Sequence, residues 1–257
     1  QNPSTEFNRV ALLQECAAAG ADYVDIEFKA YKPIEGARKI VSYHDFEKMP
    51  ANIDKIVANM NELEPDIAKI VVNIRSAHEL TELRRAIRKL VVPYCVISVG
   101  AFSEATRVLY KKLGSMLTFA SLNERDFTAP GQIPVSQMVH LYRAGDIMHS
   151  TQVFCVTGNP VSHSRSPSIF NRAFKMKNLD AVYVRLPLED FAEFDAVADI
   201  FQIAGASVTM PHKEAALAFA RWCDNDSSQI GAVNTLVRRA NWCGFNTDWQ
   251  AAHECIV

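Results

Sequence analysis

The chain has 257 residues, of which 49% are hydrophobic and 22% charged, a balance typical of a globular protein and unlike that of a disordered or fibrous chain. Its 27 basic and 29 acidic side chains give a formal net charge of -2, and neither sign forms a long run. We therefore expect small-molecule substrates as partners and no nucleic acid. No apolar stretch approaches the roughly 20 residues of a membrane span, so we expect no membrane partner and a cytoplasmic location, or a plastid one in a plant.

The cysteines and histidines give no sign of a metal site. The 6 cysteines are scattered without a C-x-x-C pair, and none of the 7 histidines forms an H-x-x-x-H pair. Closely spaced Cys or His ligands are the usual signature of bound zinc. The sequence therefore predicts reduced cysteines and no catalytic metal.

The first half of the chain alternates helical patterns with short β-branched runs. Strands are predicted at residues 23–28, 39–43, 68–73, 94–98 and 117–120, and helices at 53–63 and 78–90. Regular βα alternation predicts a parallel sheet covered by its crossover helices. Residues 2–8 are predicted as a loop, and the polar stretch 143–151 as a linker.

A second βα series follows the linker. Strands are predicted at 152–157, 181–186 and 206–209, helices from Pro167 and over 188–201 and 213–222, and a hairpin over 232–245. We therefore expect an α/β protein of two domains, residues 1–145 and residues 151–257. None of the 10 glycines is followed two places later by another, so the sequence holds no G-x-G-x-x-G dinucleotide loop.

Lys69 and His44 are the candidate catalytic residues of the first half. Lys69 interrupts the apolar run of residues 67–72, and His44 ends the preceding strand. A lysine inside a barrel can become a nucleophile that forms an imine with a carbonyl substrate. The alternative is an edge lysine whose ammonium reaches solvent.

The second half carries hydroxyl, lysine and aspartate candidates. Ser164 and Ser166 stand where a strand-to-helix loop opens a helix, a place that suits an anion such as a carboxylate, although simple N-capping by Ser166 is the alternative. Lys213 and Asp248 are a candidate polar pair, for which a surface ion pair is the alternative.

The first half resembles the type I 3-dehydroquinate dehydratases along nearly its whole length. The matching segments are GADYVDIE (20–27), S-x-HDF (42–46), AKI (68–70), Arg107, GS-x-x-TF (114–119) and APGQ (129–132). The resemblance implies a (β/α)8 barrel in which Lys69 forms an imine with the substrate and His44 moves protons. It also implies that Arg107 binds the substrate carboxylate and that Gln132 contacts the substrate, with Thr128 in place of the family's usual serine.

About five βα units are readable where a complete barrel needs eight. We therefore expect a partial barrel and a chain that is a fragment, in which the acidic partner of His44 precedes the matched region. Glu27 is not expected to take that role. If the chain were complete, we would expect no dehydratase activity.

The second half resembles the substrate-binding domain of shikimate dehydrogenase from Val153 to about Ala252. The motifs are GNPVSHSRSP (158–167), SVTMPHKE (207–214), GAVNT (231–235) and GFNTD (244–248). By resemblance, Ser164 and Ser166 bind the substrate carboxylate, and Thr209, Asn234 and Asp248 hold ring hydroxyls. Lys213 and Asp248 then flank the reacting oxygen, and all six side chains should line one pocket.

The two resemblances imply consecutive steps of one pathway, from 3-dehydroquinate through 3-dehydroshikimate to shikimate. NADP is the implied cofactor, and its Rossmann domain is absent from the chain, as is the family's closing carboxyl-terminal helix. We therefore expect shikimate to bind and NADP not to bind tightly. The alternative is a truncated, non-catalytic module that binds carboxylates, and the sequence leaves the oligomeric state open.

Overall fold

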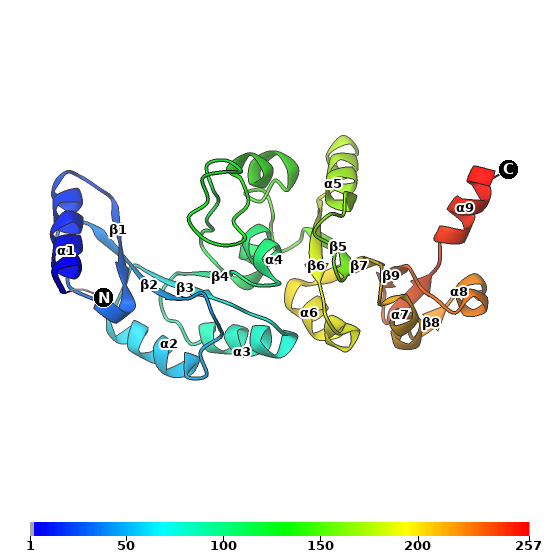
Figure 1. Ribbon diagram of the computed structural model, residues 1–257, viewed down its shortest axis with the longest axis horizontal. Coiled ribbons are helices and arrows are strands. Elements are labelled where there is room, and N and C mark those ends of the chain that lie inside the picture. Colours follow the sequence, from blue (N-terminus) through cyan, green and yellow to red (C-terminus); the bar gives the residue numbers. More distant parts are fainter. Residues whose placement is uncertain (1–2, 257) are drawn as a thin grey trace.

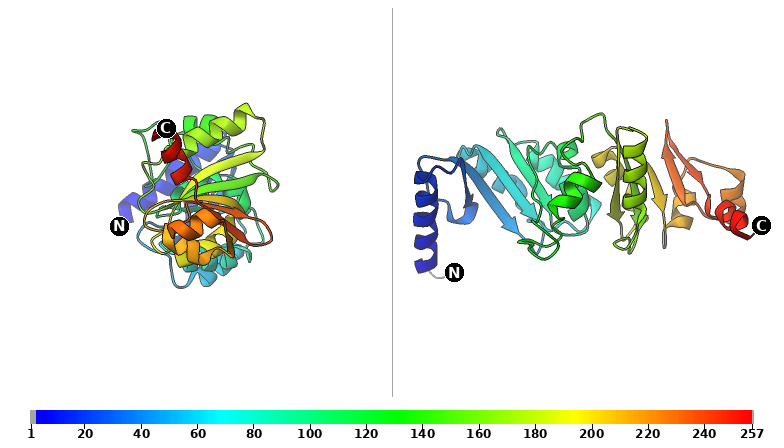
Figure 2. Two further views of the ribbon diagram at one scale, coloured as in Figure 1. Left: turned by 90° about the vertical axis from the view of Figure 1, so that its right-hand side faces the viewer. Right: turned by 90° about the horizontal axis from the view of Figure 1, so that it is seen from above.

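The computed structural model describes residues 3–256, with side chains from residue 9 onward. Within this part the strands form a four-stranded and a six-stranded sheet. The sheets follow one another along an elongated molecule, with helix α1 (Pro3–Ala18) at one end and α9 (Asp248–Ile256) at the other (Figures 1 and 2).

The first sheet is parallel throughout, in the order β1-β2-β3-β4. Its strands are β1 (Tyr23–Glu27), β2 (Arg38–Asp45), β3 (Ile67–Val72) and β4 (Tyr94–Ser98). Its helices are α2 (Ile53–Glu62), α3 (Ala77–Ile87), α4 (Ser103–Val108), and the short turns η1 (Phe28–Ala30), η2 (Tyr110–Leu113) and η3 (Gln137–Leu141). Helices α2 and α3 cover one face of this sheet (Figure 1). The predicted parallel sheet with crossover helices is confirmed.

The helices that cover the first sheet form for local reasons. Helix α2 buries Ile53, Ile56, Val57 and Met60, which lie on one stripe at helical spacing. Helix α3 begins after Ser76, whose Oγ accepts a hydrogen bond from the Glu79 amide at 3.2 Å. Helix α2 therefore begins at the predicted residue, and α3 begins one residue earlier than predicted.

Two predictions about the first half are wrong. Residues 117–120 form no strand, because beyond the bond from the Met116 amide to the Tyr94 carbonyl (2.8 Å) their backbone joins no ladder. Leu117 and Phe119 instead pack on Val71, Cys95 and Ile97. Residues 3–8 lie in α1 and not in a loop, while residue 2 lies outside the described part. The described sheet therefore has four strands where five were predicted.

The second sheet has the order β6-β5-β7-β9-β10-β8. Its strands are β5 (Gln152–Gly158), β6 (Ala181–Pro187), β7 (Ile203–Val208), β8 (Trp222–Cys223), β9 (Thr235–Arg238) and β10 (Trp242–Phe245). Its helices are α5 (Ser166–Met176), the turn η4 (Phe191–Glu193), α6 (Phe194–Phe201), α7 (Lys213–Phe219), α8 (Asn225–Ile230) and α9. Strand β5 pairs in parallel with β6 and β7, and β9 and β10 form the predicted hairpin.

The two halves pack against each other through a shared core. One cluster of buried apolar side chains runs from Val41 in β2 to Trp242 in β10. The Ala77 amide donates to Glu193 Oε2 at 3.0 Å, and Lys112 Nζ donates to Gln202 Oε1 at 3.1 Å. The position of one half therefore constrains the other.

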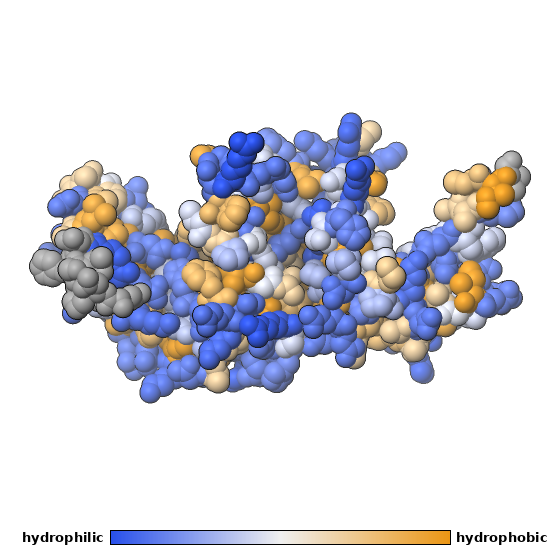
Figure 3. All heavy atoms as spheres, in the orientation of Figure 1, coloured by the Kyte–Doolittle hydropathy of each residue, from blue (hydrophilic) through white to orange (hydrophobic). Residues whose placement is uncertain are grey.

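The visible surface is mostly hydrophilic, with apolar groups scattered over it (Figure 3). Helix α9 projects from the end of the molecule and buries none of its residues; Trp249 and Ile256 are exposed on it. Within residues 3–256, no helix has the length and apolar character needed to cross a bilayer.

Candidate functional site

The first candidate site lies on the face of the parallel sheet opposite α2 and α3. Successive side chains of a strand alternate between faces, so Asp25 and Glu27 of β1 point to the same side. In the parallel register, Glu27 stands beside Ser42, and Ser42 stands beside Lys69. The fold therefore gathers carboxylate, hydroxyl and amine groups on one face.

Lys69 is held by a carboxylate. Its Nζ lies 2.7 Å from Asp25 Oδ2 and 4.4 Å from the centre of the Phe119 ring, and its side chain is 10% exposed. Ser42 Oγ donates to the other oxygen of Asp25. The alternative of a lysine that reaches solvent is excluded by these contacts. An amine in this place can react with a carbonyl once Asp25 or a nearby base accepts its proton.

His44 is partnered by Glu27, which is a correction. The Nδ1 of His44 lies 2.7 Å from Glu27 Oε2, although Glu27 was not expected to act as the acidic partner. The reason is topological, because β1 and β2 are adjacent parallel strands and the two side chains point to the same face. A histidine whose Nδ1 donates to a carboxylate presents its Nε2 to accept a proton.

Arg107, Thr128 and Gln132 lie around the loop that contains Pro130. Arg107 is buried, and its Nη atoms donate to the carbonyls of Ser98 (2.8 Å) and Pro130 (3.1 Å). Burial lowers the pKa of Arg107 to about 10. In this structure the Arg107 guanidinium therefore binds backbone carbonyls, whereas the sequence resemblance predicts that it binds the substrate carboxylate.

Gln132 Oε1 accepts from the Thr128 amide at 2.7 Å, and Gln132 Nε2 donates to the Thr128 hydroxyl at 3.2 Å. The described hydrogen bonds do not join this loop to Lys69 or His44. The roles of Arg107, Thr128 and Gln132 stay predictions.

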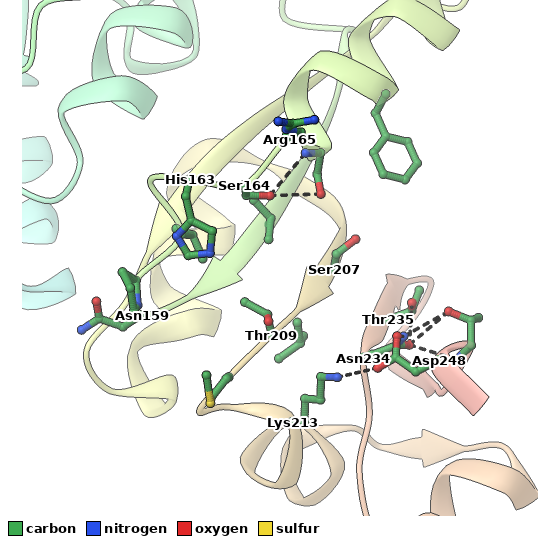
Figure 4. Close-up of a pocket in the computed structure, with 18 residues that line it drawn as sticks. Asn159, His163, Ser164, Arg165, Ser207, Thr209, Lys213, Asn234, Thr235 and Asp248 are labelled. Atoms are coloured by element: carbon green, nitrogen blue, oxygen red, sulfur yellow. Dashed lines mark hydrogen bonds and ion pairs between the residues drawn. The ribbon is translucent and has the colours of Figure 1, made fainter. Parts of the chain in front are cut away.

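The second candidate site is a cavity of about 730 Å³ beside the six-stranded sheet (Figure 4). Segments far apart in the sequence line it: the loop after β5, the end of β7, the start of α7, the residue before β9 and the start of α9. All six side chains predicted to share a pocket line this cavity: Ser164, Ser166, Thr209, Lys213, Asn234 and Asp248.

A polar cluster fills one side of the cavity. Lys213 Nζ donates to Asp248 Oδ2, and Asn234 Nδ2 donates to Asp248 Oδ1 at 2.5 Å (Figure 4). Asn234 Oδ1 in turn accepts from the Thr247 amide at 3.0 Å. The Lys213 and Asp248 side chains are 36% and 55% exposed, so both remain open to a ligand. This arrangement can donate a proton or a hydrogen bond to a ligand oxygen.

The loop between β5 and α5, which carries Ser164 and leads into Ser166, lies on the opposite side of the cavity and is called the serine loop below (Figure 4). Ser164 Oγ lies 3.1 Å from Ser166 Oγ and accepts from the Ser166 amide at 3.3 Å. Residue Arg165 occupies the cap position of α5 and makes no side-chain cap bond. Ser166 is therefore the first residue of α5 and not its cap, and the binding of an anion by the two hydroxyls stays a prediction.

Sequence reasoning missed two residues of β6 that support this cavity. Tyr183 Oη donates to Ser207 Oγ at 2.7 Å, and burial raises the pKa of Tyr183. Arg185, two residues further along the strand, donates to the carbonyl of Ser164. In the sequence, Arg185 interrupts an otherwise apolar strand, and this feature could have marked it as a candidate.

Two family models match successive parts of the chain. Residues 1–149 match the family model of type I 3-dehydroquinase, and residues 156–236 match that of the shikimate dehydrogenase substrate binding domain. The S. pombe AroM structure of dehydroquinate dehydratase and shikimate dehydrogenase is 23% identical, with a TM-score of 0.46, over 99% of this chain and 51% of that one.

Two curated relatives match at higher identity. The bifunctional 3-dehydroquinate dehydratase/shikimate dehydrogenase, chloroplastic, of Arabidopsis thaliana is 33% identical over 96% of this chain, which spans 43% of that relative. The shikimate dehydrogenase (NADP(+)) of Syntrophobacter fumaroxidans is 42% identical over 41% of this chain and 37% of that protein. Since the first family model matches more than half of the residues, the chain belongs to the type I 3-dehydroquinase family, and its residues 156–236 are similar to the shikimate dehydrogenase substrate binding domain.

Proposed function

We propose that the chain takes part in two consecutive steps of the shikimate pathway. Residues 1–145 serve the dehydration of 3-dehydroquinate to 3-dehydroshikimate through an imine on Lys69. Residues 151–257 bind 3-dehydroshikimate and shikimate for NADP-dependent reduction. The location that goes with this pathway is the cytoplasm, or a plastid as in the relative named chloroplastic.

The observation that carries the proposal is the convergence of six side chains from four separate motifs on one cavity. The cavity offers two hydroxyls at a helix amino end for a carboxylate, and a lysine, an amide and a carboxylate for ring oxygens. A volume of about 730 Å³ suits a small cyclic acid.

In the dehydratase half, the proposed chemistry uses Lys69, His44 and the two carboxylates that contact them. The Lys69 amine attacks the substrate ketone, and water leaves as the imine forms. His44, oriented by Glu27, supplies and removes protons during this exchange and during the loss of the second water. Water then hydrolyses the product imine, which releases 3-dehydroshikimate and restores the Lys69 amine, so that one water is lost overall. Asp25 fixes the position from which Lys69 attacks.

In the dehydrogenase half, this chain's residues bind and orient the substrate. Ser164 and Ser166 receive the carboxylate, while Asn234 and Asp248 hold hydroxyls. Lys213 donates a proton to the carbonyl oxygen that becomes a hydroxyl, and Asp248 holds its ammonium. The relative from Syntrophobacter fumaroxidans is named for NADP(+), the cofactor that would supply the hydride. The 257 residues contain no G-x-G spacing of the kind that holds dinucleotide phosphates, so these residues do not fit that cofactor.

The dehydrogenase part is tested by calorimetric titration of the 257-residue chain with shikimate. We expect saturable binding by the wild type, and binding at least about tenfold weaker in Lys213→Met, because a charged hydrogen-bond donor is lost. Lys175→Met is the matched control, since Lys175 is exposed on α5 and outside the cavity. Failure of the wild type to bind shikimate would overturn this part of the proposal.

The dehydratase part is tested by borohydride reduction in the presence of 3-dehydroquinate. We expect a covalent adduct on Lys69 that is absent from Lys69→Ala and present in Lys55→Ala, in which an exposed lysine of α2 is replaced. An adduct on another lysine would contradict the assignment. Shikimate binding without any adduct would favour the alternative of a carboxylate-binding module.

A further inference from the structure

Arg185 of β6 connects the first half to the loop that carries Ser164. Its Nη1 donates to Glu104 Oε2 at 2.9 Å, and its backbone amide donates to Glu104 Oε1 at 2.7 Å. Glu104 belongs to α4 of the first half, and the two side chains are 22% and 18% exposed. One carboxylate therefore fixes both the strand and the side chain of Arg185.

The remaining donors of Arg185 point to the serine loop. Its Nε and Nη2 donate to the carbonyl oxygen of Ser164 at 3.2 Å and 2.8 Å. Nη1 also donates to Tyr142 Oη at 3.1 Å. The planar guanidinium thus bridges Glu104 of the first half and the backbone of the serine loop in the second half.

Arg185 holds the backbone of the residue that carries the Ser164 hydroxyl. The carbonyl that Arg185 holds belongs to the same residue whose Oγ contacts the hydroxyl and the amide of Ser166. Burial acts against the charge of Arg185, but Glu104 and Tyr142 outweigh it, so its pKa is raised and it stays a cation. A hydrogen bond from a charged donor holds a loop more firmly than a neutral one.

We infer that Arg185 is a positioning residue for the carboxylate site formed by Ser164 and Ser166, and that Glu104 of the dehydratase half holds Arg185 in place. The inference rests on the proposed function for the identity of the ligand. The affinity of the second half for a carboxylate then depends on a residue of the first half, which joins the two parts functionally as well as through their core.

The test compares Glu104→Gln, Arg185→Gln and Arg185→Lys with the control Arg238→Gln. Arg238 also pairs with a carboxylate of the second half, Asp199, but lies outside the cavity. Shikimate and its methyl ester are titrated by calorimetry. We expect Arg185→Gln to weaken shikimate about tenfold and its ester less than about twofold, because the loop then presents its donors poorly to a charged carboxylate.

If Arg185 positions the loop, the loss of shikimate affinity should depend on how much of the Arg185–Glu104 contact each variant keeps. Glu104→Gln is expected to act in the same direction with a smaller effect, and Arg185→Lys to be intermediate because lysine keeps the charge without the planar fork. Should Arg185→Gln unfold, Tyr142→Phe replaces it, since this variant removes a single hydrogen bond to Arg185. Equal losses for shikimate and for its ester would overturn the inference in favour of a purely structural contact.

Hydrogen exchange of the ligand-free chain tests the same inference independently of binding. We expect the amides of residues 161–166 to exchange faster in Glu104→Gln and Arg185→Gln than in the wild type, and at the wild-type rate in Arg238→Gln. Unchanged exchange in both would overturn the inference. Absence of shikimate binding by the wild type would contradict the proposed function, whereas the exchange rates still decide whether the two residues hold the loop.

Discussion

The Nδ1 of His44 and the Oε2 of Glu27 lie 2.7 Å apart across two neighbouring parallel strands. Each side chain is about a quarter exposed, so the pair is open to a ligand and still fixed in direction. The His44 imidazole of β2 shares one face of the sheet with Asp25 of β1 and Lys69 of β3, which contact each other. In the function proposed for this half, the contact would orient His44 as a base for the reaction at Lys69.

Replacing Glu27 by glutamine tests whether this contact orients His44. We expect Glu27→Gln to slow formation of the borohydride-trapped adduct with 3-dehydroquinate by about tenfold or more, because a misoriented imidazole transfers protons poorly. Rapid-quench trapping measures the rate. Glu62→Gln, an exposed change on α2, is the control, and equal rates in the two variants would contradict the role.

Replacing Asp25 by asparagine leaves the ammonium of Lys69 without its anionic partner. Because Lys69 is nearly buried, we expect Asp25→Asn to lower the free energy of unfolding by roughly 1–3 kcal/mol, as measured in urea. In Asp25→Asn/Lys69→Met most of this loss should disappear, since no unpaired charge remains. Additive effects of the two changes would show that the pair does not stabilise the fold.

Gly158 ends β5 where the chain enters the serine loop, with φ of +157°. A Cβ at this position would lie 2.4 Å from Cγ2 of Thr209 and 2.8 Å from the Met210 carbonyl. We expect Gly158→Ala to destabilise the fold by roughly 1–3 kcal/mol and to weaken shikimate binding by displacing Thr209. Gly145→Ala, whose Cβ meets nothing within 4 Å, should be neutral in both measurements.

Buried thiols give a prediction about pH. Burial raises the pKa of Cys95 from 9.0 to about 12, and burial also raises the pKa of Cys155. At about pH 8 we expect iodoacetamide to label exposed Cys16 and Cys255 and to spare these two until the chain is denatured. Peptide mass spectrometry measures the labelling, and rapid modification of Cys95 in the folded chain would contradict its burial.

The raised pKa of Cys95 also predicts how the stability of the fold changes at alkaline pH. Because the folded state holds the thiol proton of Cys95 more tightly than the unfolded state, its contribution to stability is complete below pH 9.0 and is lost as the pH rises toward about 12. We therefore expect Cys95→Ala to flatten the fall of the unfolding free energy over this alkaline window. An unchanged slope would show that Cys95 does not contribute to it.

The sequence by itself determined the elements whose pattern is local. The fourth strand runs from Tyr94 to Ser98, as predicted, and Pro167 lies in the first turn of α5, because apolar periodicity and proline geometry act within a few residues. In these cases the information needed to place a residue lies close to it in the chain. The resemblance of four ordered motifs to a known family led to six residues that line the second cavity, although they lie far apart in the sequence.

Only the tertiary structure decided which residues meet across elements. Residues 117–120 have the composition of a strand but join no ladder, whereas Glu27 was assigned no role and contacts His44. The pairing of Arg185 with Glu104 joins residues 81 positions apart. Such contacts depend on strand order, on register and on how the two halves pack. The local pattern around a residue does not encode these properties, because they arise from the burial of the whole core.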